Sequence, residues 1–384
     1  MLPRYLYLIV VLLPFGISLC FATDTKSPPP NGIKDIKIVA TQGIGSEKGR
    51  AAWLRLSKSD ADMLPHILQA MNTEDIVTAN WLRTAFDRIL ERDRKVQPSK
   101  VDADALLDFV TNTKNSGRAR RFALGVVDSF RPGTTEKLLP GWLGDPEFRY
   151  DAVAALLTKA ENYTKANEKK AAQQSYEKAF HSSRDIKQAR TAAKALEEFG
   201  DKVSVAEHLG FLTHWYVIGP FDAKDKTGFA TTYPPEKQVD LKATYKGQSK
   251  KIGWKEYRVE ETWTGRHVAL VNLRETRALG DADDAVAFAY TEITVPKSRT
   301  VEFRGAADDN FIVWVNGKRM FGFEEYSNGV RHDRHAFPVT LQKGKNTILV
   351  KICQSPPYIA PNWEFFLRIA DETGKGVAFT DALK

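Results

Sequence analysis

The sequence predicts a chain of two parts, an N-terminal α-solenoid of helical hairpins followed by a C-terminal antiparallel β-sandwich. With 384 residues, the chain is longer than a single hydrophobic core usually supports. Apolar residues repeat with the helical period from about residue 47 to 210, then with period 2 or in short apolar runs. The change falls at HisTrpTyrValIleGly, residues 214–219. We therefore expect a helical domain over 33–211 and a sandwich domain over 212–384.

The composition is that of a folded protein, because hydrophobic residues make up 42% and aromatic residues 11% of the chain. The net charge of +8 raises the question of a nucleic-acid partner. The basic residues are dispersed, and the densest runs, 91–95 and 118–121, fall on expected helices. Solvated helix faces explain them, so we expect no nucleic-acid partner.

The first 22 residues have the pattern of a signal peptide. Arg4 precedes an apolar core over 5–19, and Cys20-Phe21-Ala22 has the form of a small-x-small cleavage site. We expect cleavage after Ala22 and export to the periplasm, the cell surface or the medium, with no transmembrane span left. Two alternatives remain: lipidation of Cys20, although the preceding Leu19 is large, and an uncleaved anchor, although spanning takes about 20 apolar residues.

Residues 23–32 are polar and rich in proline, and we expect a flexible tether there. Once the signal is removed, Cys353 is the only cysteine, which excludes an intrachain disulfide. It lies in the apolar run 347–353, where a small buried side chain is expected rather than a reactive thiol.

Capping residues support the helix assignments. Ser59 with Asp60, Thr73 with Asp75, and Asp102 each precede an apolar stripe with helical spacing. Residues 135–157 then form two short helices around Gly144-Asp145-Pro146, since proline suits the first turn of a helix.

The segment 135–157 resembles a HEAT repeat. The resemblance rests on Leu138, Leu139 and Leu143, on the turn Asp145-Pro146, and on Arg149, Ala152, Val153, Ala155 and Leu156. The pair 169–180 and 190–200 is similar to a tetratricopeptide hairpin. One such unit cannot bury its own apolar face, which is why an array of HEAT-like hairpins is expected.

After residue 212 the expected elements are strands. The segments are 214–219, 252–259, 267–272, 285–295, 300–305, 311–321, 346–352 and 363–369. Asn316-Gly317 predicts a tight hairpin turn, and 343–346 predicts another. Many short strands joined by turns indicate a β-sandwich, which we expect to be jelly-roll-like.

The segments 215–222, 228–236, 307–318, 340–352 and 363–371 together resemble the galactose-binding-like β-sandwich of many exported bacterial multidomain proteins. The resemblance covers about 170 residues in matching order. It implies a ligand-binding module and does not name the ligand.

Asp308-Asp309-Asn310, directly before an apolar strand, is the most informative polar cluster. The aspartate pair resembles the calcium-binding pair of protective-antigen/flocculin-type lectin domains, which implies calcium as a possible cofactor. The alternative is structural, with both carboxylates accepting backbone N–H bonds in a tight turn.

Three aromatic residues complete the candidate ligand site. Tyr326 and Tyr358 lie in loops rich in glycine or proline, and Trp363 is a further candidate platform for a sugar ring. Trp363 also lies in a strand pattern, as Trp314 does, so core packing is its alternative role. His332 and His335 would point to opposite faces of a strand, which argues against a zinc site.

No GxSxG, HExxH or CxxCH motif is present in the sequence. The leading hypothesis is a non-catalytic exported binding protein whose sandwich binds carbohydrate or another component of the cell envelope. The second is a scaffold that binds another exported protein through its helices. The third is an unrecognised hydrolase.

Overall fold

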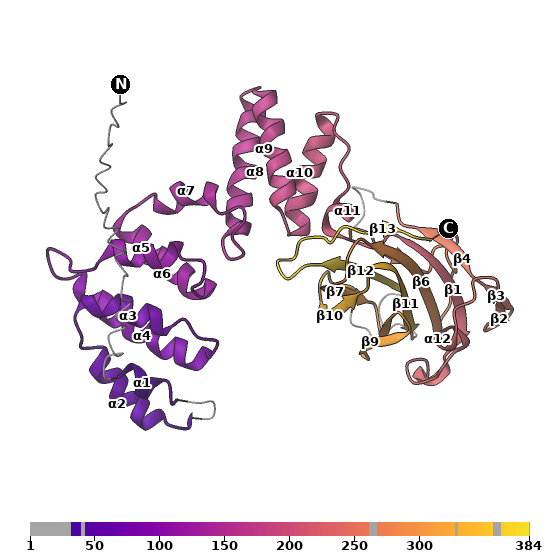
Figure 1. The fold of residues 1–384 in the computed structure, drawn as a ribbon, viewed down its shortest axis with the longest axis horizontal. Helices are drawn as coiled ribbons and strands as arrows, with labels where there is room; N and C mark the ends of the chain where they lie inside the picture. Colours follow the sequence, from indigo (N-terminus) through magenta and orange to yellow (C-terminus); the bar gives the residue numbers. More distant parts are fainter. Residues whose placement is uncertain (1–31, 40–42, 261–266, 327–328, 356–361, 384) are drawn as a thin grey trace, which may run out of the picture. The chain divides into compact units, whose positions relative to one another are not determined.

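A computed structural model describes residues 32–39, 43–260, 267–326, 329–355 and 362–383. The predicted signal peptide and almost all of the predicted tether lie outside these residues. The chain divides into two compact units, Met1–Pro132 and Gly133–Lys384. Figure 1 shows helices in the first unit, and helices followed by sheets in the second. The structure thus confirms the predicted order, in which helices precede antiparallel strands.

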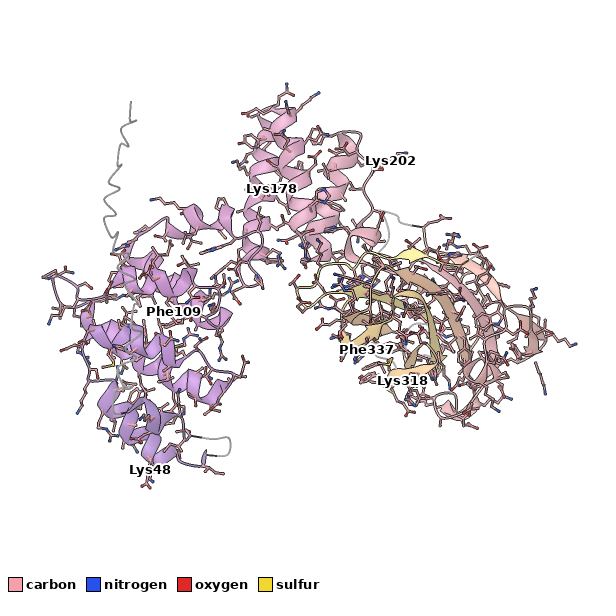
Figure 2. The ribbon with its side chains drawn as sticks, viewed as in Figure 1. Lys48, Phe109, Lys178, Lys202, Lys318 and Phe337 are labelled. Carbon is pink, nitrogen blue, oxygen red and sulfur yellow. The ribbon has the colours of Figure 1, made fainter. Side chains whose placement is uncertain are left out.

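The Met1–Pro132 unit is helical. Its elements are α1 (Ile33–Ile36), α2 (Ser46–Leu56), η2 (Ala61–Met63), α3 (Leu64–Ala70), α4 (Ile76–Asp93), α5 (Ala103–Thr111) and α6 (Gly117–Phe130). Asp75 and Asp102 cap α4 and α5, as predicted, by accepting the N–H groups of Val77 and Ala105. Phe109, labelled in Figure 2, is among the buried side chains. In the described part of the chain, no helix is both long and apolar enough to cross a membrane.

The Gly133–Lys384 unit begins with further helices. These are α7 (Thr134–Leu138), η3 (Leu139–Gly141), α8 (Arg149–Lys165), α9 (Lys169–Ser182), α10 (Ile186–Glu198) and α11 (Val205–Leu209). The Asp145 carboxylate accepts the N–H of Glu147 at 2.9 Å, so the predicted Asp145-Pro146 turn precedes α8. Gly210 ends α11 with φ of +75°, and a side chain there would collide with the carbonyl of Ile369.

The strands follow α11. They are β1 (His214–Asp222), β2 (Thr244–Lys246), β3 (Lys251–Gly253), β4 (Lys255–Arg258), β5 (Val271–Asn272), β6 (Ala285–Val295), β7 (Arg299–Ala307), β8 (Phe311–Val315), β9 (Lys318–Phe323), β10 (His335–Leu341), β11 (Gly344–Gln354), β12 (Glu364–Ala370) and β13 (Thr380–Asp381). The short helices η4 (Lys224–Lys226) and α12 (Pro234–Lys237) lie between β1 and β2.

Two antiparallel sheets face each other across one core. The larger has the order β4-β1-β6-β11-β8-β9, with β13 paired to β6, and the smaller has the order β10-β7-β12-β5. Trp215 and Val350 of the larger sheet and Phe303, Phe365 and Phe337 of the smaller belong to this core. Figure 2 labels Phe337. A second cluster, which includes Tyr233, covers the opposite face of the larger sheet.

The helices α8–α11 share a core with the smaller sheet. Phe180 of α9 and Leu196 of α10 belong to the same buried cluster as Phe211, Ala306 and Phe366. Successive residues of β12 alternate, so Phe365 enters the core between the sheets and Phe366 enters the core under the helices. The change from helix to strand lies near the predicted residue 211, but the compact units divide at Pro132 and Gly133.

His332 packs between the helices and the smaller sheet. Its ring centroid lies 4.5 Å from that of Phe366 and 5.9 Å from that of Phe211. Burial lowers the pKa of His332 from its ordinary value near 6.5 to about 4. The folded chain therefore keeps this imidazole neutral at pH values where the unfolded chain protonates it.

We expect His332→Gln to reduce the dependence of stability on pH. Between about pH 6.5 and 4 the unfolded state binds the additional proton, so wild-type stability falls as the pH falls. The wild-type chain should lose about 2 kcal/mol more than the variant between about pH 7.5 and about pH 4.5. Urea unfolding of both chains at the two pH values measures this difference. Equal losses in the two chains would contradict the low pKa of His332 in the folded chain.

Candidate functional site

Asp308, Asp309 and Asn310 form the turn between β7 and β8. Asp309 has φ of +64°, a left-handed conformation that aspartate and asparagine tolerate better than most residues. The exposed fractions are 7% for Asp308, 6% for Asp309 and 0% for Asn310. The turn is therefore built into the end of the sandwich and is not displayed on its surface.

The three side chains tie the turn to two other segments. Asp308 Oδ1 accepts the N–H of Gly329 at 3.0 Å, and Asp309 Oδ2 accepts the N–H of Ser355 at 2.9 Å. Asn310 Oδ1 accepts the N–H of Glu325. Both aspartates thus accept backbone N–H groups, and the donors at Gly329 and Ser355 lie far from the turn in the sequence.

Burial and a neighbouring negative charge act on the carboxylates of the turn. Burial, and then the charge of Asp309, raise the pKa of Asp308 above its ordinary value, although hydrogen bonds from Gly329, Asp309 and Asn362 act in the opposite direction. Two adjacent carboxylates removed from water repel each other. The amide Nδ2 of Asn310 is buried, and within the described residues it has no hydrogen-bond partner.

The donor set fits calcium only in part. Carboxylate oxygens are suitable ligands, but calcium takes about six to eight oxygens. Within the described residues, no group of three or more His, Cys, Asp or Glu side chains could hold a metal ion. Asp308 and Asp309 would therefore need carbonyl oxygens or water to complete a calcium site.

The predicted aromatic platforms differ in their surroundings. Tyr326 is half-buried; its hydroxyl donates to the Lys226 carbonyl at 2.9 Å, and the Lys226 ammonium lies 4.7 Å from the ring centroid. Burial raises the pKa of Tyr326 to about 12. Tyr358 lies outside the described residues. Tyr326 directly follows Glu325, whose N–H is bound by Asn310 of the turn.

The structure corrects the assignment of Trp363 to ligand contact. Its side chain is 0% exposed and belongs to the core between the sheets. The indole N–H donates to the carbonyl of Ile352 at 3.4 Å. A ring enclosed in this way has no face to offer a sugar, so the alternative role in core packing holds.

His332 and His335 do not converge on a shared site. His332 packs on Phe211 and Phe366, whereas the ring of His335 lies 4.3 Å from that of Phe323.

Two buried cations were not among the residues singled out from the sequence. Lys351 in β11 is 0% exposed and donates to the carbonyl of Thr231 at 2.6 Å and to the Glu236 carboxylate at 2.9 Å. Arg368 in β12 is 1% exposed, and its Nε donates to Asp333 at 2.6 Å. A charged residue inside an otherwise apolar strand is the sequence signal for both.

The comparisons with known proteins give matches only among solved structures. No family model matches the sequence. No curated protein matches it either.

Three of the matching structures show the kinds of protein that were found. A family 35 carbohydrate binding module from an environmental isolate shares 13% identity over 33% of this chain and 87% of that one, with a TM-score of 0.22. A PA14 sugar-binding domain from an RTX adhesin shares 12% identity over 44% of this chain and 94% of that one, with a TM-score of 0.25. A β-glucuronidase from an uncultured Clostridium shares 13% identity over 42% of this chain and 29% of that one, with a TM-score of 0.25.

The neighbours thus include carbohydrate-binding β domains and glycoside hydrolases. Likeness at these scores transfers no function to this chain.

Proposed function

We propose that the chain is an exported, non-catalytic binding protein whose sandwich, of jelly-roll type, binds carbohydrate or another component of the cell envelope. The ligand would contact the end of the sandwich that carries the Asp308–Asn310 turn and Tyr326. The helices, as an array of HEAT-like hairpins, would serve as a scaffold.

The observation that carries this proposal is the buried carboxylate pair. Asp308 and Asp309 are both more than nine-tenths buried, and the pKa of Asp308 is raised by burial and by the charge of Asp309. A divalent cation between them would relieve this repulsion and could also bind ligand hydroxyls. Calcium is the cation proposed, since both donors are carboxylate oxygens.

Asp309→Ala separates the calcium site from a purely structural turn. If calcium binds, a hundredfold excess over its Kd should stabilise the wild-type chain by about 2.7 kcal/mol, and the variant should lose this gain. If the turn is only structural, the variant should be destabilised by about 0.5 to 2 kcal/mol equally with and without calcium. Melting curves of both chains in calcium and in chelator distinguish the two results.

Binding itself is tested with the intact chain and a panel of cell-envelope polysaccharides. We expect retention by at least one polymer, and weaker retention of Asp309→Ala in calcium. Failure to bind any of them, with and without calcium, would reject the carbohydrate function.

A specific observation favours a second candidate, a scaffold for another exported protein. Among the described residues, five of the six large exposed apolar side chains lie in the Met1–Pro132 unit: Ile38, Ile44, Leu54, Ile76 and Val96. Exposed apolar side chains are typical of protein contact surfaces when they form a patch. Loss of partner capture in Leu54→Lys/Ile76→Lys, with unchanged polysaccharide binding, would support this candidate.

A further inference from the structure

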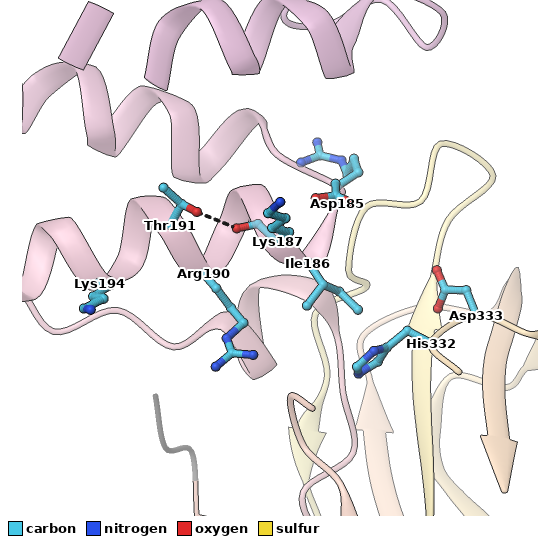
Figure 3. Close-up of a pocket in the computed structure, with 9 residues that line it drawn as sticks. Asp185, Ile186, Lys187, Arg190, Thr191, Lys194, His332 and Asp333 are labelled. Carbon is cyan, nitrogen blue, oxygen red and sulfur yellow. Dashed lines mark hydrogen bonds between the residues drawn. The ribbon is translucent and has the colours of Figure 1, made fainter. Parts of the chain in front are cut away.

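A groove of about 550 Å³ lies within the Gly133–Lys384 unit, between α10 and the turn 331–334 that precedes β10. Figure 3 shows the residues of α10 on one side and His332 and Asp333 on the other. We call it the α10 groove. Its lining consists of Arg184, Asp185, Ile186, Lys187, Arg190, Thr191, Lys194, His332 and Asp333.

The α10 groove is basic because of helical spacing. Lys187, Arg190 and Lys194 are three and then four residues apart, so they share one face of α10. Arg184 adds a fourth cation just ahead of the helix. His332 adds no charge near neutral pH, because burial lowers its pKa to about 4.

Both acidic side chains of the groove already have partners. Asp185 caps α10 by accepting the N–H of Gln188 at 2.9 Å. Asp333 accepts two hydrogen bonds from Arg368 and one from Arg304 at 3.4 Å. Asp333 is thus paired with arginines that do not line the groove, whereas Asp185 keeps its charge beside the start of α10. Each carboxylate keeps lone pairs that could accept a ligand hydroxyl.

Within the described residues, the two lysines of α10 that line the groove have no carboxylate partner. In the described residues, Lys187 and Lys194 form no ion pair. Arg184 Nη1 donates to the carbonyls of His181 and Ser183, and its Nε is buried without a hydrogen-bond partner. Burial, and then the charge of Arg149, lower the pKa of Arg184, and Asp371 offsets this in part.

Arg149 adds a further positive charge near Arg184. It is only 8% exposed, and its guanidinium donates to the carbonyls of Leu143, Gly144 and Thr373. Carbonyl oxygens satisfy its hydrogen bonds without cancelling its charge. The groove therefore lies beside two arginines whose hydrogen bonds in the structure go to carbonyl groups.

We propose that the α10 groove binds a hydroxylated carboxylate, in chemical terms a sugar acid. The ligand carboxylate would pair with Arg184 and the lysines of α10, and its hydroxyls would donate to Asp185 and Asp333. A polyphosphate fits less well, because it lacks the hydroxyl groups that could donate to those aspartates. The volume lies within the range of about 300 to 1,000 Å³ that is usual for small-ligand sites.

This site is separate from the Asp308–Asn310 turn, so it does not depend on the proposed calcium site. The test is calorimetric titration of the intact chain with glucuronate and galacturonate oligomers, with their neutral methyl esters and with inorganic phosphate. We expect at least one oligomer to bind, and its methyl ester to bind about tenfold more weakly or worse. Binding should also weaken as salt rises from about 50 to about 300 mM.

Two double variants show where the oligomer binds. Lys187→Gln/Lys194→Gln should lower its affinity about tenfold or more. Lys170→Gln/Lys178→Gln removes the same charge from exposed positions on α9 and should leave the affinity unchanged. All four lysines are exposed, so both variants should keep the wild-type melting temperature. No binding of either oligomer, equal loss in both variants, or equally tight phosphate binding would each overturn the proposal.

Discussion

Arg368→Met should destabilise the Gly133–Lys384 unit by about 3 to 5 kcal/mol. The guanidinium, 1% exposed, donates to Asp333 and also to the carbonyls of Leu209 and Gly374 at 3.2 and 3.3 Å. Methionine fills similar space but donates nothing. Asp333 then keeps only Arg304, and two buried carbonyls lose a donor.

Urea unfolding of wild type and variant measures this loss. The control is Arg258→Met in the larger sheet, because Arg258 is 61% exposed and its ion pair with Glu256 should contribute less than about 1 kcal/mol. Asp333→Asn should cost less in the Arg368→Met background than in the wild type, since the two residues interact directly. If Arg368→Met cost no more than Arg258→Met, the role assigned to the buried arginine would be wrong.

Lys351→Met should have a comparable effect, about 3 to 5 kcal/mol. The ammonium of Lys351 is enclosed by the carbonyls of Phe229 and Thr231, the Glu236 carboxylate and the ring of Tyr233, whose centroid lies 5.0 Å away. Removing it leaves Glu236, with a side chain only 13% exposed, as an uncompensated charge.

A second substitution tests this cause. Lys351→Met/Glu236→Gln should recover part of the lost stability, because the glutamine side chain carries no charge. Lys345→Met is the matched control on the same strand, since Lys345 is 60% exposed and pairs with Glu292 at 3.1 Å. It should change stability by less than about 1 kcal/mol. No recovery in the double variant would show that Glu236 is not the source of the loss.

The local patterns were sufficient to predict most strands. Asn316-Gly317 joins β8 to β9, and the predicted strand 285–295 coincides with β6. The strand His335–Leu341 was not predicted. This strand contains Pro338. The proline is tolerated because β10 lies at the edge of the smaller sheet. Proline in a strand pattern fits either an edge strand or no strand, and the local sequence does not decide between the two.

The candidate sites were harder to predict, because their contacts join distant segments. Asp308-Asp309-Asn310 could be chosen from the sequence, but its partners at Gly329 and Ser355 follow only from the folded chain. Residues 187 and 332 line the same groove because the helices and the smaller sheet share a core, which the local sequence does not show. The spacing of the α10 cations was visible in the sequence, whereas the lack of carboxylate partners for Lys187 and Lys194 was not.

The core under α8–α11 also constrains how this chain could be rearranged by recombination. A gene segment that encoded only the strands would leave Ala306 and Phe366 in water, and its product would tend to aggregate. A viable exchange has to carry the helices from Gly133 onward together with the strands. The smallest segment that keeps this core intact is thus the compact Gly133–Lys384 unit, although its sequence changes character near residue 211.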